Sequence, residues 1–218
     1  MIHTFQQLKN GAAVTALLGA LLFSCGAMAQ GSVRPEVHKP LSAAQEAIKN
    51  NQPDAALKLA AEALAVPALT AVERNAILRT RAVAATRAQN WDLVIESLEP
   101  LVVQPEIGTA DKRPMLETLV SASQQKKDYP RLVKWARQYL QEGGSNVSMR
   151  TVMIQVLAVT GQHAEVVKEM QEKMRLDDAA GKKTAEEELR MLAVSYRQLK
   201  DNAGYQATLR LLLTDRKS

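Results

Sequence analysis

Two stretches of this chain repeat one pattern: a polar turn, then an aromatic residue, then an amphipathic helix. They read AQNWDLVIESLEPLVVQP (residues 88–105) and KKDYPRLVKWARQYLQEGG (residues 126–144). In the second stretch the apolar residues follow the helical period, and so they form one stripe along the helix. A single amphipathic hairpin cannot bury such a stripe, so it must stack on neighbouring hairpins.

Aligning the second helix of each predicted hairpin extends the pattern to five copies. The equivalent positions, which we call marker positions, are Ala56, Val94, Leu132, Val166 and Tyr205, and their successive separations are 38, 38, 34 and 39. Four residues after each marker comes another small or apolar residue: Ala60, Leu98, Ala136, Met170 and Leu209. Twelve residues before each marker, where the two helices of a hairpin approach closely, are Ala44, Ala82, Val120, Ile154 and Ala193.

Helix start and stop signals agree with this spacing. The tetrapeptides Thr70–Glu73 and Thr184–Glu187 fit the capping box, in which a hydroxyl and a glutamate satisfy free N–H groups at a helix start. Glycine favours the left-handed conformation that ends many helices, and Gly143, Gly161 and Gly181 fall where helices should end. Residues 30–40 contain two prolines and no apolar period, which predicts a linker before a helical-repeat domain over 41–218.

The marker residues and the turns NQPDAA, QNWDLV, KDYPRL and GQHAEV make the chain resemble the tetratricopeptide-repeat (TPR) family. The spacing varies and the family's early Trp-Leu-Gly pattern is missing, so the repeats are degenerate. The resemblance implies an all-α fold, an α-solenoid or right-handed superhelix of about five TPR-like helical hairpins. The stretches WARQYLQEGGSNVSMRTVMIQ and LKDNAGYQATL are also similar to secreted TPR proteins of β-proteobacteria, some of which continue further, so this chain could be a shortened form.

Residues 1–29 have the pattern of a secretory signal peptide. An apolar run ends in Ala27-Met28-Ala29, the small-x-small pattern of a signal-peptidase site. Cleavage after Ala29 would deliver a periplasmic protein without a transmembrane helix. The alternative is an outer-membrane lipoprotein anchored at Cys25, because Leu22-Phe23-Ser24-Cys25 resembles an imperfect lipobox. The bulky Phe23 disfavours lipidation, and the soluble form is our prediction.

Removal of that leader leaves 27 basic and 23 acidic residues, a net charge of +4. This is mild for the length, and nucleic-acid binders concentrate far more positive charge on one face. We therefore expect no nucleic-acid partner.

The residues that carry chemistry are scarce. Outside the leader there is no cysteine, and there are two isolated histidines, His38 and His163. No HExxH, GxSxG, CxxC or phosphate-loop pattern occurs. The acidic runs at 177–178 and 186–188 fall at predicted helix ends, where such charges are ordinary. The sequence predicts no catalytic residue, metal site or cofactor.

Two surfaces are candidates for binding a partner. The first helices of the hairpins would line a concave face, suited to an extended peptide with acidic residues. Its candidate residues, besides Gln45 and Lys49, are Arg79, Arg87, Glu117, Gln124, Gln125, Thr151, Gln155, Arg190 and Arg197. The second surface is the leucine run of the last helix, which one preceding hairpin cannot cover entirely: Leu211, Leu212 and Leu213.

These observations predict a non-enzymatic periplasmic scaffold or adaptor that binds an envelope protein or an extended peptide. The last helix could also join two copies of the chain. Two alternatives stay open: a lipoprotein assembly factor held at Cys25, and a helical-repeat enzyme or enzyme subunit acting on the cell envelope.

Overall fold

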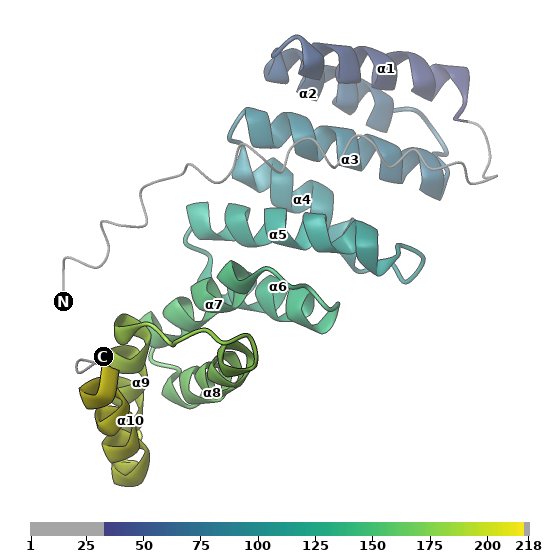
Figure 1. Ribbon diagram of the computed structural model, residues 1–218. Helices are drawn as coiled ribbons and strands as arrows, with labels where there is room; N and C mark the ends of the chain where they lie inside the picture. Colours follow the sequence, from purple (N-terminus) through teal and green to yellow (C-terminus); the bar gives the residue numbers. More distant parts are fainter. Residues whose placement is uncertain (1–32, 216–218) are drawn as a thin grey trace. The chain divides into compact units, whose positions relative to one another are not determined.

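The computed structural model describes residues 33–215. The expected leader, its cleavage site and Cys25 lie outside these residues. The described residues form ten α-helices and no strand (Figure 1). They divide into two compact units that meet in sequence between Asp128 and Tyr129, and each unit is described by itself.

The first unit contains five helices in which each element packs on the next in the chain, and α1 also packs on α3. The coloured ribbon shows the successive helices layered one over another (Figure 1). Their bounds are α1 Pro35–Lys49, α2 Pro53–Leu64, α3 Ala71–Arg87, α4 Trp91–Val102 and α5 Thr109–Gln125. The first hairpin, α1 with α2, is therefore covered by the first helix of the second hairpin.

The second unit contains the remaining five helices, and each again packs on its neighbour in the chain. Their bounds are α6 Tyr129–Gln141, α7 Val147–Val159, α8 His163–Ala179, α9 Glu186–Gln198 and α10 Asn202–Asp215. In both units the second helix of a hairpin thus packs against the first helix of the next hairpin. The pairs are α2 with α3, α4 with α5, α6 with α7, and α8 with α9.

The same backbone conformation closes every hairpin turn. Each turn has three residues, and its middle residue adopts a positive φ: Asn51, Gln89, Lys127, Gly161 and Lys200. The next N–H then donates to a carbonyl five residues earlier, as from Gln52 to Ala47 and from Asn90 to Ala85. This is the Schellman closure of a helix C-terminus. The left-handed residues are 38, 38, 34 and 39 apart, so the turns reproduce the predicted spacing of the markers.

Burial confirms the marker alignment. Ala56, Val94, Leu132 and Val166 are all fully buried, and so are the residues four positions after each of them. All five residues twelve positions before the markers are at most 5% exposed. The prediction of an all-α fold of five consecutive helical hairpins is confirmed. The handedness of the superhelix stays a prediction.

The predicted linker is wrong for residues 35–40, which belong to α1. Pro35 occupies the first helical turn, where a missing N–H is harmless. Pro40 lies inside the helix, but Val37 and Leu41 on either side of it are buried against Ala60, Ala63 and Ile77 of the next helices. This packing outweighs the hydrogen bond that Pro40 removes.

The two predicted capping boxes have different outcomes. At Thr70 both reciprocal bonds are present, from Glu73 N to Thr70 Oγ1 and from Thr70 N to Glu73 Oε2. At α9 the prediction is wrong, because the cap is Ala185, whose methyl group accepts no hydrogen bond. Only the reciprocal half remains there, with Ala185 N donating to Glu188 Oε2 at 3.3 Å.

Candidate functional site

The polar residues predicted to line a concave face are distributed over the first helices of all five hairpins. In the first unit, α3 carries Arg79 and Arg87, and both have partners within the chain. Arg79 Nη2 lies 3.1 Å from Asp111 Oδ2 on α5, and Arg87 Nη1 donates to the carbonyl of Ile48 at the end of α1. Both guanidinium groups therefore link successive first helices.

The remaining residues of this set are distributed over three helices. On α5, Glu117 interacts within the chain, Gln124 is half-buried, and Gln125 borders a polar hollow of about 500 Å³ beside Trp91, Asp92 and Lys126. On α7, Thr151 and Gln155 are half-buried. On α9, Arg190 and Arg197 are exposed.

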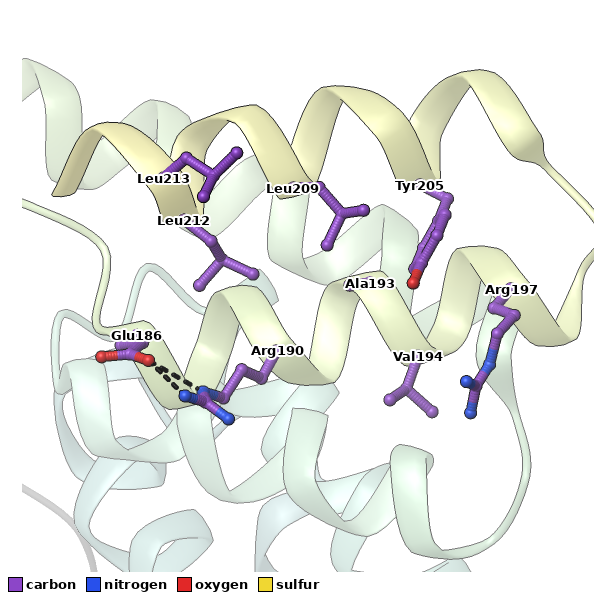
Figure 2. Close-up of a pocket in the computed structure, with 9 residues that line it drawn as sticks. All are labelled: Glu186, Arg190, Ala193, Val194, Arg197, Tyr205, Leu209, Leu212 and Leu213. Atoms are coloured by element: carbon purple, nitrogen blue, oxygen red, sulfur yellow. Dashed lines mark hydrogen bonds and ion pairs between the residues drawn. The ribbon is translucent and has the colours of Figure 1, made fainter. Parts of the chain in front are cut away.

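The structure joins these last two arginines to the predicted leucine surface in one groove. The groove has a volume of about 480 Å³ and lies between α9 and α10 (Figure 2). Its residues from α9 are Glu186, Arg190, Ala193, Val194 and Arg197, and those from α10 are Tyr205, Leu209, Leu212 and Leu213. In Figure 2 Tyr205, Leu209 and Leu212 point from α10 down toward α9, and the side chains of Arg190 and Arg197 extend downward from α9.

The three consecutive leucines point to different sides of α10, as helical geometry requires. Leu212 and Leu213 line the groove, and Leu213 is 61% exposed. Leu211 is 43% exposed and does not line it, since it lies on another side of α10. The sequence patterns predict the leucines and the arginines as two separate surfaces. They do not indicate that these residues border one groove, together with Val194, Tyr205 and Leu209.

Comparison with the other hairpins shows what is unusual about this groove. Seven residues after the marker stand Ala63, Leu101, Tyr139 and Lys173 in the first four hairpins, and all four are buried. In the fifth hairpin the same position is Leu212, which is only half-buried, as are the marker Tyr205 and Leu209. In the first four hairpins these positions pack beneath the next first helix; no helix of the described residues covers them in the fifth.

The charges along the groove are cationic on the α9 side. Arg190 donates to Glu186 Oε1 from both Nε and Nη2, at 3.0 and 2.5 Å. These hydrogen bonds raise the pKa of Arg190. The side chain of Arg197, two turns further along α9, makes no hydrogen bond or ion pair with the part of the chain that the structure describes. One of the two guanidinium groups is thus free to meet an anion.

At three of the four interfaces between successive hairpins, a cation pairs with an acid at the start of the next first helix; at the other interface, Arg137 of α6 pairs with Glu165 of α8. Arg34, just before α1, donates to Glu73 at the start of α3, and the pKa of Glu73 falls to about 2, chiefly because of this hydrogen bond. Arg79 meets Asp111 in the first turn of α5. The third pair joins Lys173 of α8 to Glu188 in the first turn of α9, at 2.9 Å.

Lys173 also bonds Asp177 at 2.5 Å, and both side chains are almost completely buried. Burial alone would lower the pKa of Lys173, but the hydrogen bonds to Asp177 and Glu188 outweigh it and raise the pKa. The sequence predicts residues 177 and 188 only as ordinary helix-end charges and does not indicate this cluster. Its signal is Lys173 itself, a lysine seven residues after a marker, where the other hairpins place Ala, Leu or Tyr.

Two pairs of side chains have the composition of a catalytic dyad: His38 with Ser42, one turn apart on α1, and His163 with Ser195. His163 Nδ1 lies 3.3 Å from Ser195 Oγ, between α8 and α9. Ser195 is fully buried, so a substrate has no route to its hydroxyl. Within residues 33–215 there is no cluster of three His, Cys, Asp or Glu side chains placed to hold a metal ion. No helix in that range is both long and apolar enough to cross a membrane.

Solved structures place the chain in a fold class. A point mutant of the Podosopora anserina kinesin light chain with nearly identical TPR-like repeats matches with a TM-score of 0.50 and 14% identity, covering 86% of this chain and all of that one. YrrB, a TPR protein with an unusual peptide-binding site, matches with a TM-score of 0.52 and 10% identity, covering 82% of this chain and 91% of that one. The fold is therefore a TPR-like helical repeat.

No protein-family model and no curated protein matches the sequence. The similarity to secreted proteins of β-proteobacteria stays a prediction.

Proposed function

We propose that this chain is a non-enzymatic periplasmic scaffold that binds another envelope protein through the groove between α9 and α10. The observation that carries the proposal is the half-exposure of Tyr205, Leu209 and Leu212, at positions where the first four hairpins are buried. When a partner covers a preformed apolar surface, apolar area is removed from water and the free energy of the complex is lowered.

The occupant that suits this groove is a helix. Each equivalent surface in the chain is packed against an α-helix, and the groove presents the same register of apolar positions. TPR-like neighbours such as YrrB, described as having a peptide-binding site, make a protein or peptide ligand a natural expectation for this fold. An extended peptide on the first helices is a weaker candidate, because it would have to displace the partners of Arg79 and Arg87.

The docking proposal is tested by site-specific photo-crosslinking in the periplasm. A benzoylphenylalanine is placed at Leu213, in the groove, or at Val103, an equally exposed residue of the first unit; both are 61% exposed. We expect a discrete adduct from Leu213 alone, cross-linked to a helical segment with an apolar stripe. Leu212→Glu should abolish it while circular dichroism stays unchanged. No adduct at Leu213, or the same adduct from Val103, would contradict docking in this groove.

The proposed location rests on the leader pattern and has its own test. Mass spectrometry of the mature N-terminus, after expression of the full chain in a bacterial host, should find Gln30 as the first residue. A lipid-modified Cys25 would support the membrane-anchored alternative. An intact leader would contradict both forms of export.

A further inference from the structure

We infer that the groove accepts an amphipathic helix with an acidic first turn, seated in the register of a sixth repeat's first helix. This inference rests on the proposed function and specifies the chemistry of its partner. It follows from two patterns that recur at the interfaces inside the chain: the charges at the start of each incoming helix, and the set of positions that each incoming helix buries.

At three interfaces a cation on one hairpin faces a carboxylate at the start of the next first helix: Arg34 with Glu73, Arg79 with Asp111, and Lys173 with Glu188. Glu73 and Asp111 occupy the same place in the repeat, since each precedes its marker by the same interval. An acid at a helix start is also favoured by the helix dipole, so each carboxylate is stabilised twice.

The last hairpin repeats the cationic half of this arrangement. Arg190 precedes its marker Tyr205 by the same interval as Arg79 precedes Val94, so the two arginines occupy equivalent places in the repeat. Arg79 has its acid on the next first helix, at 3.1 Å. Arg190 holds only Glu186 of its own helix, and Arg197 holds no described partner. A helix entering the groove therefore meets two guanidinium groups, where α3, α5 and α9 each pair an acid of their first turn with one cation.

The buried positions define the apolar face of the partner helix. The first helices α3, α5, α7 and α9 all bury the residues 12, 10 and 9 positions before their markers. The residue at the middle position of this trio is small or β-branched: Ala84, Ala122, Val156 and Ser195. The residue 12 positions before the marker faces the second helix of its own hairpin, as Ala193 faces α10, whereas Ser195 and Tyr196 bond to side chains of the preceding α8. A partner helix should accordingly carry apolar residues at the two consecutive positions equivalent to Ser195 and Tyr196, the first of them small, about two to three turns after its acids.

A second copy of the chain fits the groove poorly. The first helix, α1, has exposed Glu46 at the middle position of the trio, so its outward face is polar and does not suit an apolar groove. A symmetric pairing of two grooves would bring Arg190 and Arg197 of both copies to one interface, and like charges oppose such an association. The charge pattern thus favours a different protein with an acidic helix.

The experiment uses two synthetic helical peptides with one shared apolar face. The first has aspartate and glutamate in its first turn, and the second has lysine at the same positions. Binding to the mature chain is measured by fluorescence anisotropy at low salt. We expect the acidic peptide to bind about three- to tenfold more tightly, the range that two exposed ion pairs supply. Arg197→Glu should reduce or reverse this preference.

Lys168→Glu is the matched control, because it reverses an exposed charge on α8 outside the groove. It should leave the preference unchanged. Equal binding of both peptides that Leu212→Glu abolishes would overturn the acidic partner and leave docking in the groove intact. If neither peptide binds, or if light scattering shows a dimer that Leu212→Glu dissociates, the inference is wrong. The cross-linking at Leu213 then decides separately whether the groove docks any partner.

Discussion

At the scale of single residues, Arg34 and Glu73 hold the start of α1 to the start of α3. Glu73 is 1% exposed and accepts hydrogen bonds from the Arg34 side chain, the Arg34 N–H and the Thr70 N–H. Arg34 also donates to the carbonyls of Pro67 and Ala68, so one guanidinium fixes the loop between α2 and α3 as well. Arg34 is thereby tied to the second hairpin.

The lowered pKa of Glu73 predicts a pH-dependent stability. The pKa falls from an ordinary 4.5 to about 2, so the folded chain prefers the charged carboxylate. This contribution is complete above pH 4.5 and is lost as the pH falls from about 4.5 to about 2. Urea unfolding should show that Glu73→Gln is destabilising near neutral pH, and that its difference from the wild type shrinks toward pH 2. Glu62→Gln, which removes an exposed carboxylate, should show no such pH-dependent loss of stability. If Glu73→Gln is destabilised by the same amount at every pH, the lowered pKa of Glu73 is not the cause.

Lys173 gives a second prediction at this scale. Lys173→Met would leave the carboxylates of Asp177 and Glu188 without their cation, and both are largely removed from water. Breaking a buried ion pair by removing one partner costs about 3–5 kcal/mol of unfolding free energy. Chemical denaturation should find such a loss, whereas Lys168→Met on the exposed face of α8 should stay within about 0.5 kcal/mol. Similar effects of the two substitutions would show that the cluster does not stabilise the fold.

At the scale of helices, the half-exposure of the last hairpin has a direct energetic consequence. Leu98 and Leu209 occupy the same place in the repeat, but Leu98 is fully buried beneath the next helix and Leu209 is half-buried. Leu98→Ala should cost about 2–5 kcal/mol, because it leaves a cavity. Leu209→Ala should cost about 1 kcal/mol, because the neighbouring water already reaches this site. Equal losses in denaturant titrations would mean that the groove is closed in solution.

The same scale shows what the sequence could and could not predict. The marker positions were predictable because burial on a helix leaves a 3.6-residue apolar period, as at Leu132 and Ala136. The start of α1 was not predictable, because prolines such as Pro35 and Pro40 usually mark a turn or a helix end. Only the tertiary packing of Val37 overrides this tendency. The groove could not be predicted for a related reason. Its arginines and leucines come from different helices, and the pattern of a single helix does not indicate which faces of two helices meet.

At the scale of the molecule, each helix contacts mainly its neighbours in the chain within its own unit, and stability should vary along each unit. In such arrays the interfaces between repeats supply much of the stability, and a helix with fewer interfaces opens more easily. Within the second unit, amide hydrogen exchange should therefore be faster in α10 than in α7 or α8, which have neighbours on both sides in the sequence. The acidic peptide should slow exchange in α10. Uniform protection across α7–α10 without a ligand would contradict this view.

The constant hairpin turns have a consequence for how such a chain can change in length. Every turn spans three residues around one left-handed position, and the connections between hairpins span five or six residues, whereas the first helices range from 13 to 17 residues and the second helices from 12 to 17. Insertions and deletions should consequently accumulate at the helix ends that lie away from the hairpin turns, where no Schellman closure has to be preserved. Evolution can then lengthen or shorten a helix without altering the turn that closes its hairpin, and a spacing as uneven as 38, 34 and 39 is the result expected from such changes.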